Sequence, residues 1–185
     1  MTAIAALIHN NEMWMGSDSL DTNSNNVMYP GQRKIWIAEE AGIKWLFGCA
    51  GSLAFQQAVR YEVQLPTETP ADDMQEFLVT KFIPSLRELL TKRKDLFDSN
   101  GNVIGGGIIL IGLNEQLFLV SGFGVCKIAK SYTAIGSGGA TAYGVLHFIS
   151  EQRIEMAPEE QLRHAIKAAD DRNSTVGGEY HVLSV

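Results

Sequence analysis

The sequence predicts an α+β domain in which two β-sheets pack on each other and pairs of helices cover their outer faces. Three observations predict it: the strands come in blocks, the helices come in pairs between those blocks, and tight turns join neighbouring strands. Strands that alternated singly with helices would instead indicate a parallel α/β sheet. No linker, internal repeat or low-complexity tract interrupts the 185 residues, so we expect one domain over residues 1–185.

The first block contains two predicted hairpins. Alternating apolar residues predict strands over residues 2–8, 13–17, 33–38 and 43–49. Residues 9–12 form the first turn, and residues 39–42 form the second, where Gly42 supplies a positive φ. The polar stretch between the hairpins, residues 18–29, is expected to be a loop.

A helical period replaces the alternation after residue 51. Ser52 is the expected N-cap of the first helix, whose apolar face includes Leu53. Residues 66–70 begin and end with proline, so they interrupt the helical pattern. A second helix is expected over residues 71–96, with a bend at Pro84, because proline removes one backbone hydrogen bond.

The second block repeats this order. Strands are expected over residues 104–113, 116–122 and 132–135, with a turn over residues 99–102 before them. A helix over residues 140–149 follows, and Pro158 lies in the first turn of another helix, where proline is tolerated. The final strand is expected over residues 179–185.

Composition excludes several classes of function. The formal net charge is −6 and no Lys/Arg cluster is dense enough to form a phosphate-binding patch, so nucleic acid is not an expected partner. The longest apolar run, residues 103–113, is broken by Gly105, Gly106 and Gly107 and is too short to cross a membrane. The chain shows no secretory signal, and its two cysteines lack metal or redox spacing, so we expect a cytoplasmic protein with Cys49 and Cys126 as buried free thiols. Four widely separated histidines predict no metal site, and no cofactor is expected.

Met1-Thr2 is a potential source of a nucleophile. Aminopeptidases remove Met readily before a small residue, which would leave the Thr2 hydroxyl beside its own free α-amine. A terminal amine with a pKa of about 7.7–8.0 can accept the hydroxyl proton at neutral pH. A retained Met1 would acylate the amine and block this chemistry. Thr after Met is common, so the remaining residues must support the hypothesis.

Four further motifs follow Thr2 along the chain. Asp18 ends a strand sixteen residues after Thr2, and Lys34 leads another strand sixteen residues after Asp18. Gly51 lies in the sequence Ala-Gly-Ser between a strand and a helix, and Ser137 lies in the sequence Ala-Ile-Gly-Ser-Gly-Gly before another helix. In this order the motifs make the chain resemble, over nearly its whole length, the proteasome β-subunit and HslV (ClpQ) family of N-terminal-nucleophile (Ntn) threonine peptidases.

The resemblance implies a four-layer αββα sandwich and a role for each motif. Thr2 would be the nucleophile, and Lys34 would lower the pKa of its hydroxyl by its positive charge. Asp18 would keep Lys34 charged and oriented, because an unpaired buried ammonium is costly. The Gly51 N–H would stabilise the tetrahedral oxyanion, and Ser137 would orient the Thr2 amine.

The resemblance also implies a pocket for the substrate side chain before the scissile bond. Its expected lining is Asp21, Thr22, Gln32, Cys49 and Leu53. An Asp at the rim favours basic or polar substrate residues. Proteasomes have a late Asp and Ser before a Gly-Gly pair, but this chain has Asn173 and Val176 before Gly177-Gly178. That departure affects the hydrogen bonds expected around the terminal amine.

Stacked homo-oligomeric rings of six or seven subunits, an ATP-dependent unfoldase and unfolded protein substrates are the partners that the resemblance implies. Two other functions remain open. The chain could be a catalytically silent ring subunit with an assembly role, although such a subunit has no need of Thr2, Asp18 and Lys34 together. It could also be a small-molecule Ntn amidase. A nucleotide site is rejected because the glycine clusters lack the spacing G-x-G-x-x-G and a phosphate-binding lysine.

Overall fold

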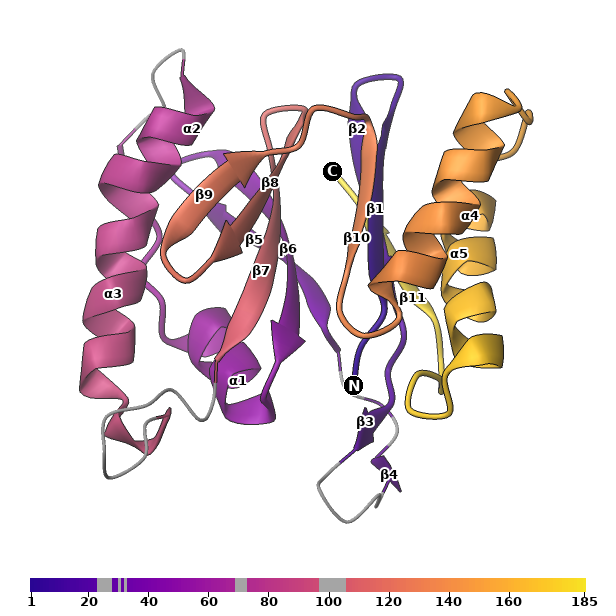
Figure 1. Ribbon diagram of the computed structural model, residues 1–185. Helices are drawn as coiled ribbons and strands as arrows, with labels where there is room; N and C mark the ends of the chain where they lie inside the picture. Colours follow the sequence, from indigo (N-terminus) through magenta and orange to yellow (C-terminus); the bar gives the residue numbers. More distant parts are fainter. Residues whose placement is uncertain (23–27, 30, 32, 69–72, 97–105) are drawn as a thin grey trace.

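The computed structural model has four layers, with helices outside and two β-sheets inside (Figure 1). It describes residues 1–22, 28–29, 31, 33–68, 73–96 and 106–185. The predicted turn over residues 99–102, the predicted strand start at residue 104 and part of the breaker over residues 66–70 lie outside the described residues. The predicted α+β sandwich is confirmed.

The first sheet has the strand order β10-β1-β2-β11, and all of its pairs are antiparallel. Its strands are β1 (Ile4–His9), β2 (Glu12–Ser17), β10 (Tyr132–Ile135) and β11 (His181–Ser184). Asn10 and Asn11 both have positive φ and make the two-residue turn that a twisted hairpin favours. The strand predicted over residues 2–8 begins at Ile4 and ends at His9 in the structure.

The second sheet has the order β5-β6-β7-β8-β9 and is also antiparallel. Its strands are β5 (Ile35–Glu40), β6 (Ile43–Gly51), β7 (Gly107–Leu113), β8 (Gln116–Ser121) and β9 (Gly124–Lys127). Positive φ at Ala41 and Gly42 closes the β5–β6 turn; the sequence predicts it at Gly42, but within a longer turn over residues 39–42. The sequence did not predict β9, because three of its four residues are exposed and give no apolar alternation.

The helices form the two outer layers (Figure 1). Their bounds are α1 (Leu53–Tyr61), α2 (Met74–Phe77), α3 (Ile83–Lys92), α4 (Gly139–Glu151) and α5 (Pro158–Arg172). The Ser52 hydroxyl accepts the Phe55 N–H at 3.2 Å, which confirms the predicted N-cap of α1.

The single helix predicted over residues 71–96 is wrong in its details. A π-helical turn, η1 (Leu78–Phe82), joins α2 to α3, and a 3₁₀ turn, η2 (Lys94–Leu96), follows α3. In the π turn the Ile83 N–H donates to the Leu78 carbonyl, five residues earlier. Pro84 has no N–H to continue the α-helical ladder, so the wider turn replaces the predicted bend.

Two other predictions are corrected. The loop expected over residues 18–29 includes a short hairpin of β3 (Asp21–Thr22) and β4 (Met28–Tyr29). Its polar sequence hides the pairing, because strands away from the core need no apolar alternation. Cys126 was expected to be buried, but it is exposed in β9; Cys49 is buried, and both thiols are free.

The core between the sheets positions their ends. A Cβ on Gly48 of β6 would lie 2.6 Å from the Met15 sulfur and 2.9 Å from a methyl group of Ile4, so only glycine lets β6 approach β1 and β2 so closely.

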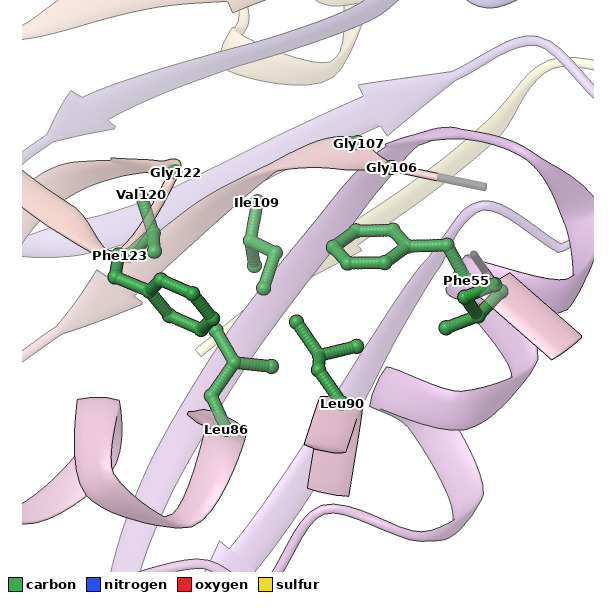
Figure 2. A pocket seen from close by; sticks show the side chains of 10 residues that line it. Phe55, Leu86, Leu90, Gly106, Gly107, Ile109, Val120, Gly122 and Phe123 are labelled. Carbon is green, nitrogen blue, oxygen red and sulfur yellow. The ribbon is translucent and has the colours of Figure 1, made fainter. Parts of the chain in front are cut away.

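Under the outer helices α1 and α3, a cavity of about 140 Å³ is lined by apolar side chains, among them Phe55, Leu86 and Ile109 (Figure 2). No helix among the described residues is long and apolar enough to cross a membrane.

Candidate active site

Four of the predicted site residues meet at one end of the two sheets. The antiparallel register pairs Ile4 with both Ser17 and Ile135, so the start of β1 lies between the end of β2 and the end of β10. The start of β5 and the end of β6 adjoin each other in the second sheet. Thr2, Asp18, Lys34 and Ser137 each lie one or two residues outside one of these strand ends. The chain begins at this same end of the molecule (Figure 1).

The Lys34 ammonium group lies buried at the centre of the cluster, with 1% of the residue exposed. Its Nζ donates three hydrogen bonds, to Asp18 Oδ1 at 2.8 Å, the Leu20 carbonyl at 2.6 Å and the Met1 carbonyl at 2.8 Å. Every N–H of the ammonium therefore has an acceptor. Burial lowers the pKa of Lys34 below its usual value, while the Asp18 carboxylate acts in the opposite direction. Asp18 thus helps to retain a charge that burial alone disfavours.

The Asp18 carboxylate is fully buried and is fixed from three sides. Besides Lys34, the Ala3 N–H donates to Oδ1 at 2.9 Å, and the Gly177 N–H donates to Oδ2 at 3.2 Å. Bonds to backbone donors favour the ionised carboxylate and orient it. The sequence indicated Asp18, but it did not identify Ala3, Gly177 or the Leu20 carbonyl, because backbone partners leave no residue signature.

Thr2 is buried, with 4% of the residue exposed, and the turn after β10 holds its backbone. The Thr2 N–H donates to Ser137 Oγ at 3.2 Å. The Ser137 hydroxyl and the Gly138 N–H donate to the Thr2 carbonyl, at 3.4 Å and 3.0 Å. Gly136 has φ +90°, and a Cβ there would lie 2.2 Å from the Thr2 carbonyl oxygen. The glycine is therefore required for this turn to approach Thr2.

The surroundings of the cluster lower the pKa of the Met1 amino group. Burial, and after it the positive charge of Lys34, lower the pKa of the Met1 amino group, while Asp21 and Asp18 oppose this effect. A lowered pKa increases the neutral fraction of an amine at neutral pH, and only the neutral amine can accept a proton.

Gly51 is the last residue of β6, the strand that lies beside Lys34. The Cys49 N–H donates to the Lys34 carbonyl at 2.9 Å, which places Gly51 two residues further along the same strand. Gly51 has φ +153°, and a Cβ there would lie 2.5 Å from the Gly106 carbonyl oxygen. The Gln56 side chain donates to the Gly51 carbonyl at 2.9 Å. These contacts fix the direction of the peptide units around Gly51.

The predicted pocket residues have different environments. Leu53 is exposed at the start of α1, whereas Cys49 is fully buried in the core, where burial raises the pKa of its thiol. Asp21 is half-buried in β3 and acts electrostatically on Lys34. The structure describes only the backbone of Thr22, and Gln32 lies outside the described residues.

A polar groove adjoins the Gly51 turn and contains Leu53. The described residues that line it also include Gln56, Gln57, Arg33 and Arg60, and its volume is about 380 Å³. Arg33 precedes Lys34 in the chain, and Gln56 contacts Gly51. The groove is therefore lined by residues that adjoin Lys34 and Gly51. None of its described lining residues is acidic.

Asn173 and Val176, which stand in the late segment before Gly177-Gly178, make their contacts away from Thr2. The Asn173 side chain accepts the Thr175 hydroxyl at 2.7 Å, within its own turn. Val176 is buried, and a Cβ on Gly138 would lie 3.2 Å from one of its methyl groups. Neither side chain makes a described hydrogen bond to Thr2. Among the described residues, no group of three His, Cys, Asp or Glu side chains could hold a metal ion.

Solved structures share this fold over the whole chain. The bacterial proteasome homologue BPH of Thiobacillus denitrificans, in complex with epoxomicin, matches with a TM-score of 0.75 and 17% identity, covering 100% of this chain and 98% of that one. HslV of Trypanosoma brucei matches with a TM-score of 0.69 and 16% identity, covering 99% and 98%. Anbu, an ancestral β-subunit, of Yersinia bercovieri matches with a TM-score of 0.70 and 15% identity, covering 99% and 81%.

These similarities show a proteasome-like Ntn fold. At the level of sequence, no family profile and no curated protein matches the chain.

Proposed function

We propose that the chain is a threonine-type endopeptidase subunit whose nucleophile is Thr2, exposed by cleavage of the Met1–Thr2 bond. One observation carries the proposal: the third hydrogen bond of the buried Lys34 ammonium goes to the carbonyl of that bond, at 2.8 Å. Cleavage removes this acceptor and leaves an ammonium donor directed at the new N-terminus. The other two donors remain on Asp18 and Leu20, which keep the charge in place.

The proposed peptide hydrolysis uses the positions of Thr2, Lys34 and Ser137 as follows. The Thr2 hydroxyl attacks the substrate carbonyl carbon, its proton passes to the Thr2 amine, and Lys34 stabilises the developing alkoxide. The Gly51 N–H donates to the tetrahedral oxyanion. The C–N bond then breaks, the leaving amine takes the proton from the Thr2 ammonium, and the ester on Thr2 is hydrolysed by water. Ser137 Oγ, which accepts the Thr2 N–H at 3.2 Å, orients the amine throughout.

The substrate class is less constrained than the reaction. We propose that the enzyme hydrolyses unfolded protein or peptide chains in the cytoplasm, within stacked homo-oligomeric rings served by an ATP-dependent unfoldase. A protein of similar fold supports assembly, since Anbu of Pseudomonas aeruginosa forms a helical assembly. Native mass spectrometry of the purified protein tests this, and a monomer at micromolar concentration would contradict it.

The groove beside Gly51 supports a preference for acidic substrate side chains. Arg33 and Arg60 line the groove, whereas the Asp21 carboxylate acts on Lys34 and the Met1 amine. This preference is opposite to the one that Asp21 alone suggests.

Short fluorogenic peptides test the proposal. Thr2→Ala is expected to abolish hydrolysis, and Lys34→Ala is expected to abolish it without changing assembly. Lys81→Ala is the matched control, because its ammonium group pairs with Glu68 on the surface. A silent assembly subunit predicts no hydrolysis by the wild-type protein. A small-molecule amidase predicts hydrolysis of simple amides in preference to peptides.

A further inference from the structure

The Gly177 peptide connects both halves of the Asp18–Lys34 pair. Its N–H donates to Asp18 Oδ2 at 3.2 Å. Its carbonyl accepts the Ser19 N–H at 3.1 Å and the Leu20 N–H at 2.9 Å. The carbonyl of Leu20 in turn accepts from Lys34 Nζ at 2.6 Å. A displacement of Gly177 would therefore move an acceptor of Lys34 and a donor to Asp18 together.

One side chain outside the predicted site lies beside Gly177, and a second side chain binds the first. Asp170 lies in the last turn of α5, and Tyr180 lies just before β11. The Tyr180 hydroxyl donates to Asp170 Oδ2 at 2.5 Å, which closes the intervening segment into a loop. Gly177 has φ +154°, and a Cβ there would lie 3.2 Å from Asp170 Oδ1. The Asp170 carboxylate therefore packs against the Gly177 backbone on one side and binds Tyr180 on the other.

We propose that Asp170 and Tyr180 are positioning residues, which hold the Gly177 peptide and through it fix the geometry of Asp18 and Lys34. The proposal rests on the proposed peptidase function. Asn173 and Val176 make contacts within the late segment and with Gly138, and neither contacts the Asp18–Lys34 pair in a described hydrogen bond. The hydrogen bond between Asp170 and Tyr180 would order the segment in their place. Tyr180 remains a donor because burial and the neighbouring Asp170 raise the pKa of its hydroxyl.

The charges around the loop define how the effect reaches Lys34. The groups that act on Lys34 are Asp18 and Asp21, and Lys34 acts in turn on the Met1 amine. Asp170, Asp171 and Asp18 act on Tyr180. Of all these groups, Asp18 is the one that a shift of Gly177 would move relative to Lys34. A weaker Asp18–Lys34 contact lowers the pKa of Lys34, and activity would then be lost at lower pH on the alkaline side.

Tyr180→Phe and Asp170→Asn test the proposal, because both keep the shape of the side chain and remove or weaken the hydrogen bond. We expect kcat to fall about tenfold or more with little change in KM, since small misplacements of reacting groups are costly. The alkaline limb of the pH profile should move to lower pH. Asp171→Asn is the matched control on the same helical turn. It removes an exposed pair with Lys167 at 2.8 Å and one charge that acts on Tyr180, but it keeps the hydrogen bond between Tyr180 and Asp170, so kcat and the pH profile should stay unchanged.

The result that would overturn the proposal is a lower melting temperature with an unchanged kcat and an unchanged pH profile in both variants. A second measurement separates this failure from failure of the proposed function. NMR titration of the Lys34 ammonium in the Thr2→Ala background requires no activity. Its pKa should fall in Tyr180→Phe and Asp170→Asn and not in Asp171→Asn. If the wild-type protein hydrolyses no peptide, the proposed function fails, and this titration alone decides whether Asp170 and Tyr180 position Lys34.

Discussion

Asp18→Asn should strongly destabilise the fold, because it removes a negative charge in hydrogen-bond contact with a buried ammonium group. Lys34 and Asp18 are 1% and 0% exposed, and their contact is 2.8 Å. Breaking a buried pair from one side costs roughly 3–5 kcal/mol, since the remaining charge stays buried without compensation. This is a large part of a typical unfolding free energy of about 5–15 kcal/mol.

The structure places the expected loss near the lower end of that range. Asn at position 18 can still accept the Ala3 N–H, and Lys34 keeps the Leu20 carbonyl and, in chains that retain Met1, the Met1 carbonyl. We therefore expect a loss of about 3 kcal/mol at pH 7. The double variant Asp18→Asn/Lys34→Met should be more stable than Asp18→Asn, because it also removes the buried charge.

Urea unfolding at fixed protein concentration, followed by tryptophan fluorescence, measures these differences. Glu68→Gln is the matched control, since its partner Lys81 lies on the surface at the same 2.8 Å distance, and no measurable change is expected. A loss below about 1 kcal/mol in Asp18→Asn would refute the reasoning. So would a double variant that is no more stable than Asp18→Asn.

The pH dependence of stability carries the same information. Burial lowers the pKa of Lys34 in the folded state, so the unfolded chain binds more protons between that lowered pKa and the usual 10.5. The contribution of Lys34 to stability therefore rises with pH in this window and is constant below it. In Asp18→Asn the opposing attraction is lost, so the rise should begin at lower pH than in the wild-type protein. An identical onset in both proteins would contradict this account.

Three further predictions concern the surroundings of the site. Gly51→Ala should lower kcat by about 10²–10³ and destabilise the fold, because its φ is +153°; Gly144→Ala, which adds a methyl group to open space in α4, should retain activity. Cys126 should react with a thiol reagent in the folded protein, whereas Cys49 should react only on unfolding, because it is buried and its thiol pKa is raised; equal rates would contradict the fold. Arg60→Gln should lower kcat/KM for peptides with Glu before the scissile bond and spare those with Leu; equal losses would remove the case for an acidic preference.

The sequence predicts most of the fold because local signals and packing agree there. The predicted hairpins, the Ser52 cap and the helix that begins at Pro158 each have a short-range cause. The failures have physical causes too. The β3–β4 hairpin is polar in sequence and β9 is mostly exposed, so alternation does not mark them. The π turn before Pro84 depends on one missing N–H, which a sequence pattern shows only as a break.

Side chains of the candidate site could be predicted, and its backbone partners could not. Thr2, Asp18 and Lys34 are linked by regular spacing and by type. The Gly177 peptide contacts Asp18 across 159 positions of the chain, and no residue type requires that contact. Tyr180 and Asp170 are ordinary residues for a loop and a helix, so their hydrogen bond becomes visible only when the chain is folded.

The central claim is that Thr2 becomes a terminal nucleophile, and covalent labelling tests it most directly. The purified protein is treated with a threonine-directed epoxyketone, and intact and peptide mass spectrometry locate the adduct. The account predicts one adduct per chain, on a Thr2 that lacks Met1, and none in Thr2→Ala. Labelling of chains that retain Met1, or peptide hydrolysis that survives in Thr2→Ala, would contradict it.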